Sequence, residues 1–398
     1  MIAVEEARAR IIAALRPTQA EIVALPQAWG RIAAAPVIAR LTQPPADVSA
    51  MDGFALRAAD SGPLQVIGSA PAGHPFPGQV GPGQAVRLFT GSLIPEGADA
   101  VLVQEDAELQ GDVMVPRSAA RPGAHIRRAG QDFAAGDTLI AAGVTLGARA
   151  IGLAAAGNHP WLAVHRRPRV AILATGDEIA LPGEPIRQGG IVSSNAHAIA
   201  ALVRAGGGDP LILPIAPDTP EAMAAAADSL GGMDLLVTSG GASVGEHDLV
   251  QSGLAARGFE LDFWKIAMRP GRPLLFGRLG RVPVLGLPGN PVSAFVCSVL
   301  FLLPALARLS GQDGAALPQV SARLAAGVAA NDHREDHLRA RLHQGADGTL
   351  SATAFGRQDS SMLRVLTEAD GLIVRPPGAP ALDAGATVPV IRLDVFGL

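Results

Sequence analysis

VPVLGLPGNPVSAFVCSVLFLLPAL, residues 282–306, joins two apolar runs through a short loop that contains glycine and two prolines. The first run has the length and bounding residues of a buried strand. The second run, PVSAFVCSVLFLLPAL, is about 16 residues long, which is short of a bilayer span, so it predicts a buried helix. Asn290 is expected to cap this helix and Pro291 to occupy its first position. The stretch therefore predicts a strand–loop–helix unit.

The same alternation extends outward through residues 166–315. Strand-like runs are RVAILAT (169–175), LILPIA (211–216) and LLVTSG (235–240). Helices are expected at NAHAIAALVRAG (195–206, capped by Asn195 or Ser194), after Thr219-Pro220, and at HDLVQSGLAARG (247–258). Strands that alternate with helices predict a doubly wound parallel sheet. An N-terminal helix with Val4, Ala7, Ile11 and Leu15 on one face is expected within residues 1–19.

The flanking segments have different textures. Residues 46–134 are rich in Gly and Pro with short strand-like runs, which predicts a β-rich module. Residues 20–45 are short apolar pieces broken by proline, and residues 135–165 contain the helix-like GARAIGLAAAG. Residues 316–398 hold only short strand-like runs and predict a small β-barrel or sandwich. The fold class is thus α/β and multidomain.

Composition excludes several classes of function. Charged residues make up 17% of the 398 residues and the net charge is −4, so non-specific nucleic-acid binding is not expected. The one cysteine, Cys297, excludes an internal disulfide and a cysteine metal cluster. The acidic start of the N-terminal helix does not resemble a signal peptide, so we expect a cytoplasmic protein with no membrane partner.

Three of the expected strands end in unusual loops: ATGDE (174–178), TSGGASVGEHD (238–248) and LPGNP (287–291). Ligands of open parallel sheets bind outside the carboxyl ends of the strands, so the three loops are expected to face one crevice. Glycines allow the backbone to approach a phosphate, and helix N-termini supply free N–H groups. One such loop alone would equally be an ordinary turn, but three in one domain favour a phosphate site.

Carboxylates accompany these loops at Asp177, Glu178 and Asp248. A phosphate pocket has no electrostatic reason to hold carboxylates unless a cation separates them from the ligand, which points to Mg²⁺. The alternative for Asp248 is a helix-start residue favoured by the helix dipole, and Asp218, just before Thr219, has a similar capping alternative. No P-loop and no spaced GxGxxG is present, which disfavours ordinary ATPases and dinucleotide enzymes.

Lys265, in LDFWKIAMRPGRP (261–273), is the single lysine among 32 basic residues. We expect DFWKIAM to be one strand, which would place Lys265 and Arg269 on the same face, with a turn at Pro270-Gly271 bringing Arg272 near. Three cations on one patch would bind an anion, although an exposed arginine-rich edge is the alternative. Lysine is a compact point charge suited to a phosphate, so Lys265 is expected where a guanidinium does not fit.

Seven motifs in order resemble the molybdopterin molybdenumtransferase (MoeA) family, to which the E domain of gephyrin is related. The motifs are SAMDGFA (49–55), FTGSLIPEGADAVLVQE (89–105), IRRAGQDF (126–133), ATGDEIALPG, VTSGGASVGEHD, FWKIAMRPGRP and GLPGNPVSAF. The resemblance implies a linking domain (20–45 plus 135–165), an inserted β-rich domain (46–134), a molybdopterin-binding α/β domain (1–19 plus 166–315) and a C-terminal β-barrel (316–398). It also implies a homodimer with each active site across the subunit interface, and contact with other enzymes of the cofactor pathway.

The family's reaction takes adenylylated molybdopterin and molybdate, requires Mg²⁺, inserts the metal at the dithiolene and releases AMP. The matching positions imply catalytic residues Asp52, Thr90, Asp132, Glu178, Asp218, Asp248 and Lys265, with Glu178 and Asp248 as metal ligands. They imply ligand contacts from Arg127, Gly176, Gly240, Gly241, Ser243, Lys265, Pro288, Gly289, Asn290 and Pro291. A molybdate pocket is implied at Arg269, Arg272, Ser360 and Arg339, with Arg334 as the alternative to Arg339. Positions 269 and 272 are commonly lysine in the family.

Two other functions stay open at this point. A molybdopterin adenylyltransferase would share the α/β domain, but adenylylating relatives lack the SAMDGFA and FTGS modules. A non-catalytic molybdopterin carrier or scaffold would bind the ligand without releasing AMP.

Overall fold

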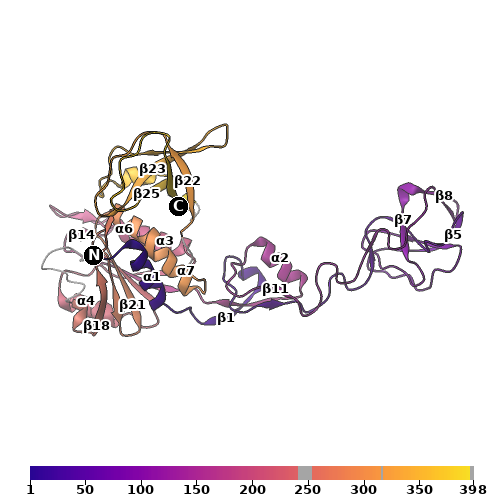
Figure 1. The fold of residues 1–398 in the computed structure, drawn as a ribbon. Coiled ribbons are helices and arrows are strands. Elements are labelled where there is room, and N and C mark those ends of the chain that lie inside the picture. Colours follow the sequence, from indigo (N-terminus) through magenta and orange to yellow (C-terminus); the bar gives the residue numbers. More distant parts are fainter. Residues whose placement is uncertain (241–252, 315–316, 395–398) are drawn as a thin grey trace.

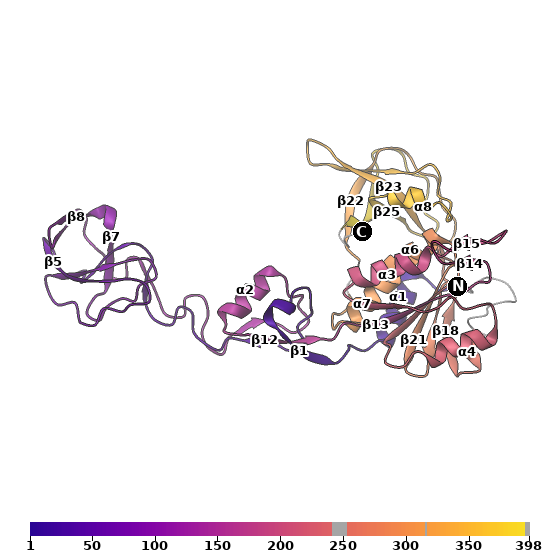
Figure 2. The same ribbon diagram turned by 180° about the vertical axis from the view of Figure 1, so that it is seen from behind.

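The computed structural model describes residues 1–240, 253–314 and 317–394. The molecule is elongated, with the α/β domain and the C-terminal barrel at one end, a small linking module in the middle and a β-rich module at the far end (Figures 1 and 2). The chain leaves the α/β domain through β1 (Ala20–Ala24) and returns to it through β12 (Trp161–His165). These two strands pair antiparallel, so the outgoing and returning segments are joined where the linking module begins.

A six-stranded sheet of order β16-β13-β17-β21-β20-β18 forms the centre of the α/β domain. Its strands are β16 (Asp209–Ile212), β13 (Arg169–Ala174), β17 (Leu235–Ser239), β21 (Val282–Leu287), β20 (Leu275–Leu279) and β18 (Phe259–Trp264). The first four strands are parallel to one another, but β20 is antiparallel to both of its neighbours, β21 and β18, so the sheet is mixed and not wholly parallel as expected. The reason is local: only Gly280 and Arg281 connect β20 to β21, which is too short for a parallel crossover.

Helices cover both faces of this sheet, as the doubly wound prediction requires. One face packs against α1 (Val4–Ala14), α3 (Asn195–Ala205), α6 (Pro291–Cys297) and α7 (Leu303–Leu309), and the other against α4 (Pro220–Asp228). Thr219 accepts a hydrogen bond from Ala222 N at 3.2 Å and Pro220 opens α4, which confirms the predicted cap.

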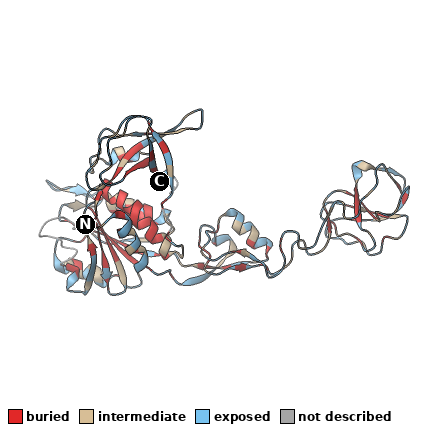
Figure 3. Cartoon of the chain, viewed as in Figure 1, coloured by how far each residue is buried: buried red, intermediate tan, exposed pale blue. Residues whose placement is uncertain are grey.

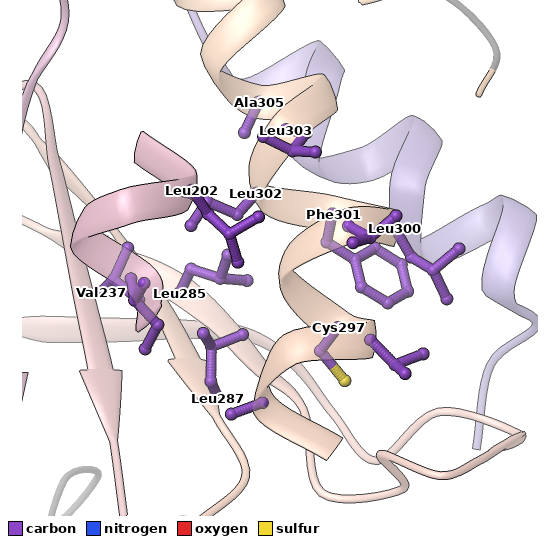
Figure 4. Packing of buried hydrophobic residues seen from close by; sticks show 14 of the residues in the cluster. Leu202, Val237, Leu285, Leu287, Cys297, Leu300, Phe301, Leu302, Leu303 and Ala305 are labelled. Carbon is purple, nitrogen blue, oxygen red and sulfur yellow. The ribbon is translucent and has the colours of Figure 1, made fainter. Parts of the chain in front are cut away.

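The apolar run that predicted a buried helix forms one. α6, the π-helical segment Ser298–Leu302 and α7 make a continuous helix of mean hydropathy 2.1, and 83% of its most apolar window is buried. By length and composition it is the one helix among the described residues that could cross a membrane. Figure 4 shows Leu302 beside Leu202 of α3, while Phe301 lies on the opposite side of the helix, and both belong to the same buried cluster. The run is therefore explained by core packing.

The linking module is small. It consists of the β1–β12 pair, a second pair of β2 (Val37–Ile38) with β11 (Thr138–Ile140), a 3₁₀ turn Leu25–Gln27 (η1) and α2 (Ala148–Ala156). Its core includes Leu146, Ala154, Leu162 and Val164. Figure 3 shows that buried residues concentrate in the α/β domain and form thinner strips in the two outer modules.

The far module is built on a six-stranded sheet of order β7-β4-β6-β5-β9-β8. Its elements are β4 (Gly53–Leu56), β5 (Leu64–Ala70), β6 (Gln84–Leu88), β7 (Ala100–Val103), η2 (Gln104–Asp106), β8 (Ala107–Gln110) and β9 (Val113–Pro116), with β3 (Val48–Ser49) and β10 (Ile126–Arg127) as a separate pair. The two-residue alternation of a strand explains its two cores, since Phe54 and Leu56 face one and Ala55 the other.

The C-terminal region is a closed five-stranded barrel. Strands follow the order β23-β24-β22-β26-β25, and β25 pairs again with β23 to close the ring. The elements are β22 (Gln319–Leu324), β23 (Glu335–Gln344), β24 (Leu350–Ala354), α8 (Leu363–Thr367), β25 (Gly371–Arg375) and β26 (Thr387–Arg392). The α/β domain contributes β19 (Met268–Arg269), which pairs parallel with the start of β23. The barrel is thus tied to the α/β domain by a strand.

Candidate active site

A cavity of about 800 Å³ lies at the carboxyl ends of β13, β17 and β21. The three predicted loops converge on it, together with the start of α3 and a serine of the barrel. The predicted site residues that line it are Gly176, Glu178, Asp218, Gly240, Pro288, Gly289, Asn290 and Pro291. A crevice at the carboxyl edge of the parallel strands is where ligands of this kind of sheet bind.

Two glycines of the cavity are required by close packing. Gly176 has a φ of +142°, and a Cβ on it would lie 2.6 Å from Glu178 Oε2. Gly240 has a φ of +100°, and a Cβ there would lie 2.5 Å from the carbonyl oxygen of Thr175. The first and second loops therefore touch through backbone, and the open backbone they present suits a phosphate.

The acidic residues gather beside these loops. The amide of Asp218 donates to Asp177 Oδ1 at 3.2 Å. Burial raises the pKa of Asp218, and the neighbouring carboxylates of Asp177 and Glu178 raise it further. Among the described residues no group of three or more His, Cys, Asp or Glu side chains is arranged to hold a metal ion. The three carboxylates repel one another, and a cation would relieve that repulsion.

Three residues of the second loop, Gly241, Ser243 and Asp248, lie outside the described residues. The same holds for residues 247–252 of the predicted helix 247–258, of which residues 253–255 are helical in the structure.

The third loop is held by the barrel. Pro291 is the first residue of α6, as predicted, and Asn290 precedes it, but the Asn290 side chain does not cap the helix. Its Nδ2 donates instead to Ser360 Oγ at 2.9 Å, and the amide of Val292 donates to the carbonyl of Ser360 at 3.1 Å. Ser360 therefore reaches the site by docking on the N-terminal end of α6, beside the cavity-lining Ser361.

The cationic stretch differs from the expectation. The predicted single strand DFWKIAM is interrupted, since β18 ends at Trp264 and Lys265 adopts a left-handed φ of +69°. The even spacing therefore does not put Lys265 and Arg269 on one face. Lys265 Nζ lies 3.7 Å from the centre of the Trp264 ring, while Arg269 pairs with the buried carboxylate of Asp336 in the barrel. Arg272 is exposed, and the next residue, Pro273, lines the cavity.

Arg339 occupies a different environment from the exposed cation expected for an oxyanion pocket. It is 1% exposed, and its guanidinium donates to Gln358 Oε1 and to the carbonyls of Arg357, Asp359 and Met362. These contacts shape the loop that carries Ser360. Arg334, the alternative residue, is paired with Asp332.

Four predicted site residues lie in the far module. Asp52 Oδ1 accepts hydrogen bonds from Thr90 N at 2.7 Å and Thr90 Oγ1 at 2.9 Å, which lower the pKa of Asp52. Arg127, at the end of β10, and Asp132 are both exposed. Within one chain the structure does not bring these residues to the cavity, because the linking module separates the two (Figure 1).

Sequence reasoning missed the contribution of Asn195 to the cavity. Asn195 is the first residue of α3 and not a cap, and neither it nor Ser194 makes a side-chain cap. Asn195 Nδ2 donates to Ser239 Oγ and to the carbonyl of Gly289, both at 2.8 Å. Its partners are 44 and 94 residues away, so no local pattern could have identified them.

Family models match nearly the whole chain. "MoeA N-terminal region (domain I and II)" matches residues 2–157, "Probable molybdopterin binding domain" residues 171–308, and "MoeA C-terminal region (domain IV)" residues 321–393.

Known proteins agree with these models. A molybdopterin molybdenumtransferase of Nostoc sp. is 35% identical over 389 residues, covering 94% of this chain and 89% of that protein. One of Haemophilus influenzae is 34% identical over 399 residues, covering 98% of each. A crystal structure of the molybdopterin biosynthesis MoeA protein from Pyrococcus horikoshii superimposes with a TM-score of 0.85 at 29% identity, covering 98% of this chain and 99% of that one. The motifs, the four-part architecture and these matches agree, and the chain belongs to the molybdopterin molybdenumtransferase (MoeA) family.

Proposed function

We propose that this protein inserts molybdenum into molybdopterin, taking adenylylated molybdopterin and molybdate as substrates and releasing AMP. Membership of the MoeA family supports a transferase of molybdenum cofactor biosynthesis. The single observation that carries the proposal is the cavity, where three glycine-containing loops meet beside carboxylates at the edge of a parallel sheet. The phosphates of the ligand would lie on the backbone N–H groups of these loops and at the start of α6.

We propose that carboxylates at the cavity hold a magnesium ion together with the ligand. Glu178 and Asp218, together with Asp248 of the second loop, would hold Mg²⁺, and phosphate oxygens of the ligand would complete its coordination. Desolvation, and then repulsion from Asp177 and Glu178, raises the pKa of Asp218, and a bound cation would offset both effects. When bound, Mg²⁺ would neutralise charge on the phosphates.

We propose the same four residues for the molybdate pocket as the sequence implied, but the structure suggests a different role for each. Arg272 and Ser360 would contact the oxyanion by charge-assisted and neutral hydrogen bonds. Arg269 would contact the oxyanion while it remains paired with Asp336. Arg339 would act indirectly, because it supports the loop that carries Ser360. Lys265, held over Trp264, is proposed to neutralise a ligand phosphate, and a Lys265→Arg variant with unchanged activity would exclude a need for its compact charge.

The far-module residues require a second copy of the chain. We propose a homodimer in which Asp52, Thr90, Arg127 and Asp132 of one subunit complete the cavity of the other. The proposal is supported by the elongated shape, which keeps these residues away from the cavity of their own subunit. A cytoplasmic location, and delivery of the cofactor to other enzymes of the pathway, are part of the same proposal.

AMP release from adenylylated molybdopterin tests the function. The purified protein would be assayed with Mg²⁺, with and without molybdate, and again after chelation of Mg²⁺. Release that requires both molybdate and Mg²⁺ is expected. Binding without release under all conditions would indicate a carrier. AMP transfer from ATP to molybdopterin would indicate an adenylyltransferase.

A further inference from the structure

Asn195 connects two loops of the cavity that belong to different strands. Its Nδ2 donates to Ser239 Oγ, at the end of β17, and to the carbonyl oxygen of Gly289, in the loop after β21. The Gly289 carbonyl can only accept, which fixes the amide with its nitrogen toward the loops. Both protons of Nδ2 are used, and the side chain lines the cavity.

The two loops follow paired strands, with Ser239 in register with Leu287, and beyond that pairing the described residues of the loops offer no side chain of their own to join Ser239 and Gly240 to Gly289. They meet through glycine, since Gly240 Cα lies 3.7 Å from the position a Cβ on Gly289 would occupy. Glycine leaves the backbone open to a ligand but supplies no side chain for a cross-link. A donor from a third element, the start of α3, therefore joins them.

The third loop is also held from its opposite side. Asn290 Nδ2 donates to Ser360 Oγ of the barrel loop, which the buried Arg339 supports. The loop thus lies between two anchors, α3 on one side and the barrel on the other. If the α3 anchor is lost, only the β17–β21 pairing, which ends at Ser239 and Leu287, sets the position of Gly289 relative to Ser239.

We propose that Asn195 is a positioning residue that holds the second and third loops in register, so that their backbone N–H groups face the phosphate of the bound ligand. The inference rests on the proposed function, which supplies a phosphorylated ligand. It differs from a role in starting α3, because Asp is as good as Asn at a helix start and is favoured there by the helix dipole. If Asn195 positions the loops, Asp should impair ligand binding more than Ala, because the aspartate carboxylate would be repelled by the carbonyl oxygen of Gly289.

The order of three substitutions separates these roles. Steady-state kcat and KM for adenylylated molybdopterin would be measured for wild type, Asn195→Ala and Asn195→Asp, with calorimetric binding of AMP as an independent readout. We expect KM and the Kd for AMP to rise about threefold in Asn195→Ala and about tenfold or more in Asn195→Asp, with a smaller change in kcat. Ser239→Ala, which removes one of the two bonds, should give a smaller increase. Its effect should not add to that of Asn195→Ala.

Ile11→Val is the matched control for stability, because it removes one methyl group from the core of α1, away from the cavity. It should lower the melting temperature without changing KM or the Kd for AMP. An Asn195→Asp variant that keeps the wild-type KM and Kd would overturn the proposal, as would additive effects of Asn195→Ala and Ser239→Ala. Absence of AMP binding and release in the wild type would instead refute the proposed function.

Discussion

Asp52 in the far module and Asp218 at the cavity are carboxylates proposed for one active site, yet their surroundings are opposite. Asp52 accepts two hydrogen bonds from Thr90, which lower its pKa and stabilise the charged form. Asp218 is exposed, but partial desolvation and the neighbouring carboxylates of Asp177 and Glu178 raise its pKa and disfavour the charged form. The charged form of Asp52 is therefore stabilised within its own module, whereas the charged form of Asp218 would be stabilised by a bound cation.

This comparison separates the part of the proposed site that forms within one chain, the cavity, from the part that depends on a second chain, the far module. The cavity has close-packed glycines, a cross-linking asparagine and a barrel loop docked on Asn290, so its described part is shaped within one chain by the α/β domain and the barrel. The far module has an oriented carboxylate at Asp52, and the cavity in that module that is lined by residues 75–79 and 93–96 does not include it. In the proposed function, Asp52 takes part in the reaction only when the far module lies against the cavity of a second subunit.

Loss of Asp52 should have the largest effect. Asp52→Ala is expected to reduce molybdate-dependent AMP release at least about 100-fold, because it removes an oriented negative charge from the proposed active site. The melting temperature should change little, since the carboxylate is exposed on a local turn. Asp60→Ala in the same module is the control, as Asp60 accepts only from Gly83 N at 3.0 Å in a turn. Wild-type turnover by Asp52→Ala would remove the far module from the site.

Mixing two inactive variants tests whether the halves come from different subunits. Asp52→Ala and Glu178→Ala subunits, dissociated and reassociated in equal amounts, should recover about a quarter of the wild-type AMP release. Half of the dimers would be mixed, and each would hold one intact site of two. No recovery, with mixed dimers demonstrated by differently tagged subunits, would place both residues in the same chain's site.

Glycine substitutions compare the packing of the two regions. Gly240→Ala places a Cβ 2.5 Å from the Thr175 carbonyl at a φ of +100°, so we expect a loss of about 3 kcal/mol and weaker ligand binding. Gly83→Ala in the far module has a φ of +72° with nothing within 4 Å, so only the backbone conformation is strained, at a cost of about 1–2 kcal/mol. Urea-induced unfolding measures both. Equal losses would show that the cavity loops can separate to accommodate a side chain.

The smallest effect is the pH dependence of stability, where the two carboxylates should differ in sign. The folded state of the ligand-free protein binds the Asp218 proton more tightly than the unfolded chain does, so Asp218 lowers stability as the pH rises above its ordinary pKa of 3.8. Asp218→Asn should therefore raise the melting temperature at pH 7, and the gain should shrink toward pH 4.

Asp52 contributes stability above its ordinary pKa of 3.8 and loses that contribution as the pH falls through its lowered pKa. Asp52→Asn should lower the melting temperature slightly at pH 7, and the loss should shrink below pH 4. Differential scanning calorimetry across this range checks both variants. Shifts of the same sign would contradict the contrast between the two environments.

The sequence by itself determined the features that depend on neighbours in the chain. The apolar run after Asn290 forms the buried helix, and Thr219-Pro220 starts α4 with the expected cap. The convergence of three strand-end loops also followed, because parallel strands bring their carboxyl ends to one edge. Hydrophobic periodicity and backbone preference act over a few residues, so they can be read from a local pattern.

Tertiary structure alone decided which side chains meet. Lys265 and Arg269 separate because β18 ends at Trp264 and β19 joins the barrel sheet, where Asp336 binds Arg269. Arg339 and Asn195 likewise serve loops far away in sequence. A polar side chain binds whatever donor or acceptor the folded chain brings to it, and partners 44 or 94 residues away leave no periodic signal. The distance of Asp52 from the cavity has the same origin, since it follows from how the modules are joined.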